Sequence, residues 1–317
     1  MSSKGYKYYG PVFWVAIASF LVPFFVGWHT FKNGHWTKPT ESVVDESGVD
    51  HLTWDYLLKS HVRNGLIDYN AIRKDYLFKE YLEQLATCNP KALKTDNERL
   101  ALACNAYNAF VINGVNKHKI SEAVTNLKVV CKDENGNSLL DKEGKVVTKG
   151  FFELEEHDLG GKLVSLDELE KEIILPQYKD PRVHVALVCG AVGCPAIRPE
   201  AYTGETIQAQ LEDQSAQFAN NPNYVRYNPE TQELVLSQIL EWYADDFDTK
   251  KYSGGYAGGY SEWLTRHVED GDLKTQIAKA AAGQIKVNYY QYNWKLNSLS
   301  KPESDQIGGG GSGKVPE

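Results

Sequence analysis

Two cysteines, one histidine and one arginine lie close together in residues 180–202, which read DPRVHVALVCGAVGCPAIRPEAY. They are His184, Cys189, Cys194 and Arg198. A thiol acts as a nucleophile when a base such as histidine lies within hydrogen-bond reach. The same residue types also form disulfides and metal sites. Reactive side chains gather more tightly here than elsewhere in the chain, so we place the candidate site in this stretch.

A buried strand is expected to position these side chains. Residues 183–188 are apolar apart from His184 and follow the turn pair Asp180-Pro181, a pattern typical of a strand covered on both faces. Along such a strand His184 lies roughly 13 Å from residue 188. Cys189 is then out of its reach, whereas Cys194 can meet it if the loop folds back.

Four interpretations of Cys189, Cys194 and His184 are open at this point. Cys194 is a thiol nucleophile with His184 as its base, or the two cysteines form a disulfide across a tight loop. A zinc site needs about four ligands, and Cys-x4-Cys with one distant histidine is a weak pattern for it. We therefore predict no metal and no cofactor. In the fourth interpretation all three side chains pack or hydrogen-bond without reacting.

A helix is expected over residues 97–116. Its buried stripe recurs at spacings of three and four: Leu100, Cys104, Tyr107 and Val111. Asn105 and Asn108 share a face beside this stripe, and we expect their amides to brace a neighbouring strand or loop. Alternatively, they line the same pocket as His184. Cys104 falls in mid-helix, away from the dipole that lowers a thiol pKa, so it is a poor nucleophile.

The remaining patterns alternate between helices and short strands. Helices are expected over about 51–62, 76–87 and 204–218, from the capping box at Ser165 to Ile174, and from Ser237, Ser261 and Asp272. Strands are expected within 129–147, over 224–227 paired with 233–236, and over 284–290. This order predicts an α+β fold with one globular domain, a mostly antiparallel sheet and packed helices.

Four segments resemble the motifs of one known family. They read HVALVCGAVGCPAIRPEAY at 184–202, NGLIDY at 64–69, NAYNA at 105–109 and YNWKLN at 292–297. On these residues the chain resembles the family called "domain of unknown function 547" over roughly 51–297. The resemblance implies a fold and a candidate site, not a reaction.

The chain departs from the family pattern in one place. Family members usually carry aromatic residues before Asn-x-Tyr-Asn, whereas Leu102, Ala103 and Cys104 stand there in this chain. If those aromatic residues wall a substrate pocket, the pocket of this chain has a different shape. We predict Tyr107, within the motif, and Arg198 as binding residues.

Composition narrows the class of partner. The chain has 317 residues, of which 42% are hydrophobic and 24% charged, as in ordinary globular proteins. A net charge of −8 argues against a nucleic-acid partner, because phosphate binding needs an excess of Lys and Arg. The 19 tyrosines and seven tryptophans are typical of a membrane interface or a protein contact. Five cysteines leave at least one thiol unpaired within the chain.

Residues 11–28 (PVFWVAIASFLVPFFVGW) carry no charge. As a helix they span roughly 27 Å, which is about the thickness of the hydrocarbon core. Trp14 and Trp28 lie near its two ends, as in the aromatic belts of spanning helices. A cleaved signal peptide is the alternative, but the aromatic end lacks a small-residue cleavage site. We predict an uncleaved, single-pass transmembrane anchor in contact with membrane lipid.

The charges around this run favour one orientation. Lys4, Lys7 and the amino terminus precede it, and Lys32 and Lys38 follow it. The small excess on the first side favours a cytoplasmic N-terminus and an extracytoplasmic (periplasmic) globular domain. The predicted organisation is a tail at 1–10, the anchor at 11–28, a linker at 29–50, the globular domain at 51–297 and a flexible tail at 298–317.

The sequence supports two functions. We predict a membrane-anchored extracytoplasmic accessory or scaffold subunit that binds beside a membrane protein complex, because of the anchor, the short tether and the many tyrosines. The alternative is a thiol-dependent hydrolase or transferase. In that case Cys194 attacks, His184 is its base, and Asn105 or Asn108 supplies an oxyanion or orienting group.

The protein is expected to stay with the membrane fraction after a carbonate wash. An uncharged run of this length binds lipid far more tightly than a surface patch does. Recovery of a soluble form that begins after Trp28 would instead identify residues 11–28 as a cleaved signal peptide.

Overall fold

The computed structural model describes residues 31–32, 35–36 and 44–299. The predicted anchor at 11–28, the tail at 1–10 and residues 300–317 lie outside the described residues. Among the residues that are described, no helix is long and apolar enough to cross a membrane. Residues 47–50 of the predicted linker pack on the domain, with Val49 fully buried and Asp50 capping the first helix.

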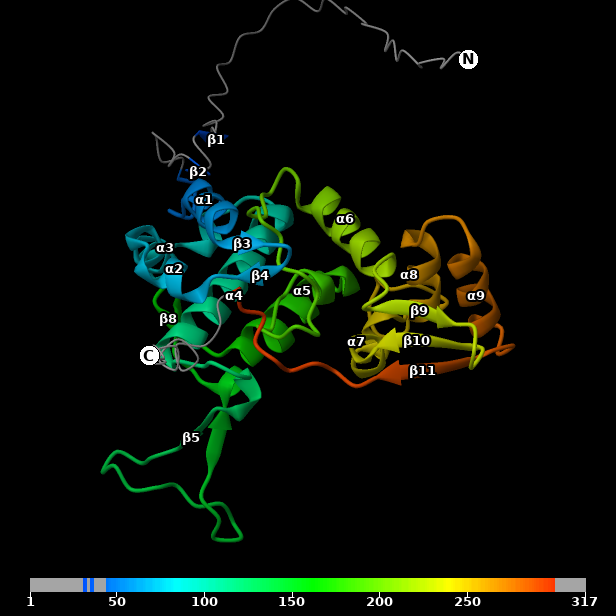
Figure 1. Ribbon diagram of the computed structural model, residues 1–317. Coiled ribbons are helices and arrows are strands. Elements are labelled where there is room, and N and C mark those ends of the chain that lie inside the picture. The colour runs from blue at the N-terminus through cyan, green and yellow to red at the C-terminus, as the bar shows by residue number, and fades with distance from the viewer. Residues whose placement is uncertain (1–30, 33–34, 37–43, 300–317) are drawn as a thin grey trace, which may run out of the picture.

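Four helices form one half of the domain (Figure 1). They are α1 (His51–His61), α2 (Tyr69–Lys74), α3 (Tyr76–Thr87) and α4 (Asp96–Lys117). Helix α4 begins with a capping box, in which Thr95 and Glu98 satisfy each other's backbone amides. It is buried along most of its length, so the other elements of this half assemble around it. Trp54 of α1 and Tyr81 of α3 stack with their ring centroids 5.1 Å apart.

A three-stranded sheet forms the other half. Its strand order is β11 (Lys286–Tyr290), β10 (Glu233–Ser237), β9 (Val225–Asn228). Strands β9 and β10 are antiparallel, and β10 and β11 are parallel. Helices α8 (Gly259–His267) and α9 (Asp272–Ala281) cover one face, and α7 (Gln238–Trp242) follows β10 directly (Figure 1). Helix α6 (Ile207–Ala219) contacts both α4 and α8 and so joins the two halves.

Short antiparallel pairs complete the fold. They are β1 (Phe31–Lys32) with β2 (His35–Trp36), β3 (Val62–Arg63) with β4 (Leu66–Ile67), β5 (Lys128–Val130) with β6 (Thr148–Gly150), and β7 (His157–Leu159) with β8 (Lys162–Val164). Single 3-10 turns lie at Pro90–Ala92, Val124–Asn126, Phe151–Glu153 and Ala244–Phe247. The predicted α+β class with short antiparallel sheets and packed helices is confirmed.

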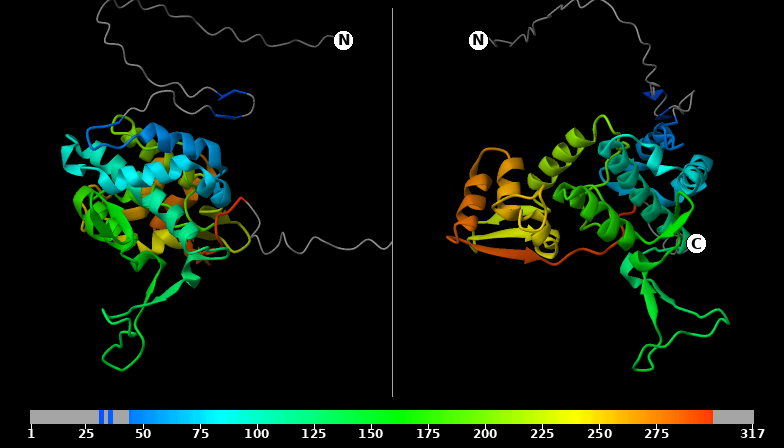
Figure 2. Two further views of the ribbon diagram at one scale, coloured as in Figure 1. Left: turned by 90° about the vertical axis from the view of Figure 1, so that its left-hand side faces the viewer. Right: turned by 180° about the vertical axis from the view of Figure 1, so that it is seen from behind.

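The segment between β5 and β6 forms an arm that projects from the body (Figure 2). No residue of 125–150 is buried. The predicted turns are present, with Gly136 and Gly144 at positive φ. The arm carries the exposed apolar side chains Leu139, Leu140 and Val146, and Val130 at the end of β5 is exposed as well.

The predicted strand at 183–188 is wrong. Residues Pro181–Val185 form a 3-10 helix, which Asp180 caps by accepting a hydrogen bond from the Arg182 amide. Pro181 at its start fixes a φ angle suited to a helical turn. A short apolar run is buried in either conformation, so hydrophobicity alone did not distinguish the two.

The helix predicted from Ser165 to Ile174 is present but differs in type and length. Ser165 Oγ accepts a hydrogen bond from the Glu168 amide at 3.0 Å, as a capping box requires. Residues Glu168–Ile174 form a π-helix that continues as α5 (Leu175–Tyr178). Pro176 has no amide hydrogen and cannot extend a regular i→i−4 ladder. Such wide helical turns are common at functional sites.

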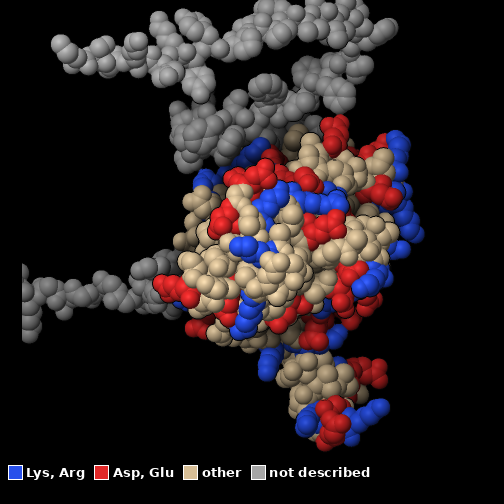
Figure 3. All heavy atoms as spheres, turned by 90° about the vertical axis from the view of Figure 1, so that its right-hand side faces the viewer, with Lys and Arg blue, Asp and Glu red and all other residues tan. Residues whose placement is uncertain are grey.

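Charged side chains are interspersed on the face that Figure 3 shows. Basic and acidic residues alternate over this surface, and neither sign forms an extended region there. Several of them pair along one helix, for example Arg266 with Glu262 on α8.

The buried His157 makes the stability of the fold depend on pH. Its ring stacks on Phe110 with centroids 4.9 Å apart, and neither ring nitrogen has a hydrogen-bond partner in the described part of the chain. Burial lowers the pKa of His157 to about 4. The unfolded chain, with an ordinary histidine pKa, therefore binds this proton first. The free energy of unfolding falls as the pH drops from about 6.5 through 4, by about 3 kcal/mol from this group.

We expect His157→Phe to reduce this pH dependence. Urea unfolding of the wild type and the variant at pH 7 and at pH 4 measures it, because all other titrating groups cancel in the difference. An equal loss of stability in both proteins would show that His157 does not stay neutral in the folded state.

Candidate functional site

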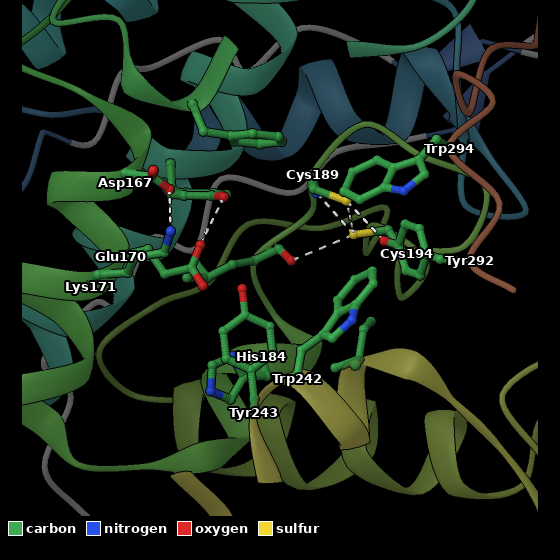
Figure 4. A pocket seen from close by; sticks show the side chains of 14 residues that line it. Asp167, Glu170, Lys171, His184, Cys189, Cys194, Trp242, Tyr243, Tyr292 and Trp294 are labelled. Carbon is green, nitrogen blue, oxygen red and sulfur yellow. Dashed lines mark hydrogen bonds and ion pairs between the residues drawn. The ribbon is translucent and has the colours of Figure 1, made fainter. Parts of the chain in front are cut away.

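A cavity of about 290 Å³ lies where the helical half meets the sheet half. Six of its 14 lining residues are Phe, Trp or Tyr, and its polar groups are two thiols, tyrosine hydroxyls and a few charged side chains (Figure 4). The lining residues are Tyr107, Phe152, Asp167, Glu170, Lys171, His184, Leu187, Cys189, Cys194, Ile239, Trp242, Tyr243, Tyr292 and Trp294. Cavities of this kind, largely apolar with a few convergent polar groups, are typical of ligand sites.

The two thiols touch at one end of the cavity. The Sγ atoms of Cys189 and Cys194 are 2.8 Å apart. The hydroxyl group of Tyr292 lies 3.0 Å from Cys189 Sγ, and the Cys189 amide donates to Cys194 Sγ at 2.9 Å. Cys194 is 5% exposed, whereas Cys189 is only partly buried. Cys189 is thus the more exposed residue of the pair.

The environment drives the pKa values of the two thiols apart. The hydrogen bond between the two thiols lowers the pKa of Cys189 and outweighs the opposing effect of burial, and the Tyr292 hydroxyl adds to the lowering. Burial raises the pKa of Cys194 well above its usual value, and the adjacent Cys189 raises it further. Burial also raises the pKa of Tyr292, so this side chain stays a neutral phenol that can donate a hydrogen bond to Cys189 Sγ. Cys189 is therefore the more acidic thiol of the pair.

Asn108 holds the backbone in front of Cys189. Its Nδ2 donates to the Ala186 carbonyl oxygen at 3.0 Å, and its Oδ1 accepts from the Val188 amide at 2.9 Å. Both hydrogen bonds are buried. The amide side chain thus supplies the pairing that a neighbouring strand would give. Asn105 does the same for Tyr202, with hydrogen bonds of 2.8 and 2.9 Å to its carbonyl and amide. Both asparagines brace the chain, as expected.

The segment after β11 lies across the loop that carries the thiols. The Val192 amide donates to the Lys295 carbonyl, the Gly193 amide to the Asn293 carbonyl, and the Asn297 amide to the Gly190 carbonyl. A Cβ atom on Gly193 would lie 2.9 Å from the Asn293 nitrogen, which only glycine avoids. We call residues 292–297 the strap.

Residues of β4 and α2 hold the strap in place. The Tyr69 hydroxyl donates to Asn297 Oδ1 at 2.6 Å, and the Ile67 amide donates to the Asn297 carbonyl at 2.9 Å. All four segments that carry the family resemblance therefore meet at the thiol loop.

His184 bonds to a different partner from the one predicted. Its Nε2 lies 2.8 Å from Asp246 Oδ2, and its ring stacks on Tyr243 at a centroid distance of 4.0 Å. Burial opposes ionisation of Asp246, but the hydrogen bonds from His184 and Lys251 outweigh it and lower the pKa of Asp246. No hydrogen bond joins His184 to Cys194 within the described residues. His184 does line the same cavity as the thiols.

The two predicted binding residues, Tyr107 and Arg198, lie in different surroundings. Tyr107 lines the cavity and donates to Glu170 Oε2 at 3.1 Å. Arg198 lies outside the cavity lining and binds Glu200 and Asp213, so its visible contacts are structural. Burial raises the pKa of Cys104, in agreement with its predicted inertness. The described residues contain no group of three or more His, Cys, Asp or Glu side chains that could hold a metal ion.

Sequence reasoning missed several residues of the site. Glu170, Tyr243 and Asp246 were not singled out, and Tyr292 appeared only as part of the resembling segment 292–297. Glu170 follows Leu166 by four positions and so falls on the buried side of its helix, where a charged residue is unusual. A charged residue at this buried helix position is a sequence signal for the site. The pairing of His184 with Asp246 joins residues 62 positions apart, and no local sequence signal predicts it.

The fold and site define an α+β domain with a buried thiol pair at the end of an aromatic cavity. Residues 90–219 match the model of the family described as "Protein of unknown function, DUF547", which confirms the resemblance seen in the sequence over these residues. The matched segment covers less than half of the chain. It includes both thiols and Asn108, whereas Asp246 and the strap lie beyond it. Comparison with curated proteins and with solved structures found no match.

Asn108→Ala is expected to destabilise the fold and loosen the thiol loop. It leaves the Ala186 carbonyl and the Val188 amide without partners, at a cost of about 2–4 kcal/mol. Denaturant unfolding measures this cost, with the exposed Asn126→Ala as a control that changes stability by less than about 0.5 kcal/mol. Equal stability of both variants would show that water replaces the Asn108 hydrogen bonds.

Proposed function

We propose that this domain catalyses thiol–disulfide exchange, with Cys189 as the attacking thiolate and Cys194 as the resolving thiol. The observation that carries the proposal is the 2.8 Å separation of the two Sγ atoms at the end of the cavity. A disulfide needs its sulfur atoms about 2.05 Å apart. Closing the bond between Cys189 and Cys194 therefore needs a shift of less than about 1 Å.

The unequal environments of the two thiols support this assignment. The attacking thiol in exchange must be ionised and accessible, and its partner must stay protonated until the second step. Cys189 is partly exposed to the cavity, with a lowered pKa. Cys194 is buried, with a raised pKa. Each thiol has the property that its step requires.

Exchange suits the geometry better than hydrolysis does. A cysteine hydrolase needs a base within hydrogen-bond reach of its nucleophile. The hydrogen bond of His184 goes to Asp246, and the close neighbours of Cys194 Sγ are Cys189 and the Leu187 carbonyl. The aromatic contact of His184 with Tyr243 gives it a role in shaping the cavity wall.

Redox titration tests the proposal. After equilibration in dithiothreitol buffers and alkylation, mass spectrometry should show a Cys189–Cys194 disulfide that forms and is reduced reversibly. Cys88 and Cys104 are buried apart from this pair and serve as internal controls that stay thiols. Two free thiols under every oxidising condition would remove the proposal.

Tyr292→Phe tests the cause of the lowered Cys189 pKa, and Cys194→Ser tests the resolving role of Cys194. The first removes one hydrogen bond to the thiolate and should raise that pKa by about one unit. The second keeps a donor at position 194 but removes the resolving sulfur, so mixed disulfides accumulate on Cys189. The rate of alkylation of Cys189 against pH measures the first effect, and trapping of a disulfide probe measures the second.

A second candidate function is an accessory subunit beside a membrane protein complex. The uncharged run at 11–28 and the arm with exposed Leu139 and Leu140 support it. In this proposal the run anchors the domain outside the cytoplasm, where disulfide chemistry is also favoured. Purification in mild detergent tests it, because an accessory subunit brings a stoichiometric partner with it and an autonomous enzyme does not.

A further inference from the structure

The cavity contains one buried carboxylate without a counter-ion. Glu170 is 8% exposed, and its partners are the hydroxyl groups of Tyr107 and Tyr243. In the part of the chain that the structure describes, no Lys, Arg or His lies within 4.0 Å of it. Buried charges are ordinarily paired, because desolvation of a lone charge is costly. A ligand cation would supply the missing partner.

The other charges of the lining already have partners. Lys171 Nζ lies 2.8 Å from Asp167 Oδ1, and His184 is bonded to Asp246. Glu170 therefore sets the sign of the charge that a ligand meets in the cavity. That sign is negative.

Aromatic rings surround the same space. The wall residues are Tyr107, Trp242, Tyr243, Tyr292 and Trp294. The face of an aromatic ring attracts an ammonium group, most strongly where water is excluded. A carboxylate combined with several ring faces is suited to an organic cation and disfavours an anion.

The carboxylate and the thiols face the cavity from opposite sides (Figure 4). Glu170 and Tyr243 lie on one side, and Cys189, Cys194 and Tyr292 on the other. One small ligand can therefore place a sulfur atom at Cys189 while its cationic group lies towards Glu170. The cavity volume of about 290 Å³ admits a small molecule, not a folded protein.

We infer that the substrates are low-molecular-weight disulfides with an ammonium group near the sulfur, as in the disulfide of an aminothiol. This inference rests on the thiol–disulfide exchange proposed above. The Cys189 thiolate attacks one sulfur, the substrate S–S bond breaks, and the departing thiolate takes a proton from water. The Cys194 sulfur then attacks Cys189, and its proton goes to the second leaving thiol. One substrate disulfide is reduced to two thiols, and the protein dithiol is oxidised to a disulfide.

Three disulfides of similar length test the charge preference: cystamine, which is cationic, bis(2-hydroxyethyl) disulfide, which is neutral, and dithiodiglycolate, which is anionic. The rate of Cys189–Cys194 oxidation is followed by alkylation and mass spectrometry. Each rate is divided by the rate for a small reference thiol, which removes the intrinsic differences between leaving groups. We expect a normalised preference for the cation over the neutral compound of at least about tenfold, and a slower reaction with the anion.

Two carboxylate variants on the same helix assign the preference. Glu170→Gln should bring the ratio of cationic to neutral rates close to one. Glu172→Gln removes an exposed charge two residues away and should keep the wild-type ratio. A preference that persists in Glu170→Gln would overturn the assignment to this carboxylate.

The wild-type comparison alone decides the inference if Glu170→Gln fails to fold. Equal normalised rates for the three disulfides would remove the ammonium preference and leave thiol–disulfide exchange in place. Failure of all three compounds to oxidise the pair would remove both, because the exchange itself would then be absent.

Discussion

The site depends on one side chain whose hydrogen bonds replace those that a neighbouring strand would make. Asn108 lies in the middle of the most buried helix and pairs with the backbone on both sides of Leu187. Without Asn108 and with no neighbouring strand, these backbone groups would be buried without partners, at a cost of about 1–3 kcal/mol each. The side-chain amide of Asn108 fixes the direction of the backbone at residues 186–188. Cys189 follows immediately, so its position is set by the rigid helix and not by the loop.

The strap completes this arrangement from the other side. A loop with two thiols, two glycines and a proline has little regular structure of its own. Its amides find partners on residues 293–297, and Tyr69 fastens the strap to the helical half. The thiol loop is therefore held by Asn108 of α4 on one side and by the strap on the other. This accounts for a close approach of two sulfur atoms in a segment that contains no helix or strand between residues 186 and 206.

Local signals in the sequence predicted most of the helices and strands. Helix α3 begins and ends at the predicted residues, and β9 and β10 pair as expected, because caps, turns and periodicity are encoded within a few residues. The 3-10 helix at Pro181–Val185 differs from the predicted strand, since a short apolar run is compatible with both. The bracing role of Asn108 followed from helical spacing. The sequence is compatible with several arrangements of Cys189 and Cys194, and it does not predict the pairing of His184 with Asp246, which depends on how distant segments pack.

The strap also has a consequence for the order of events during synthesis. Cys194 leaves the ribosome 102 residues before Leu296, an interval of roughly 5–20 s at ordinary rates of elongation. During that time both cysteines belong to a nascent chain whose loop lacks its closing segment. The hydrogen bonds that set their spacing do not yet exist. The part of the lowering of the Cys189 pKa that Tyr292 contributes is therefore acquired only when residues 292–297 dock on the loop.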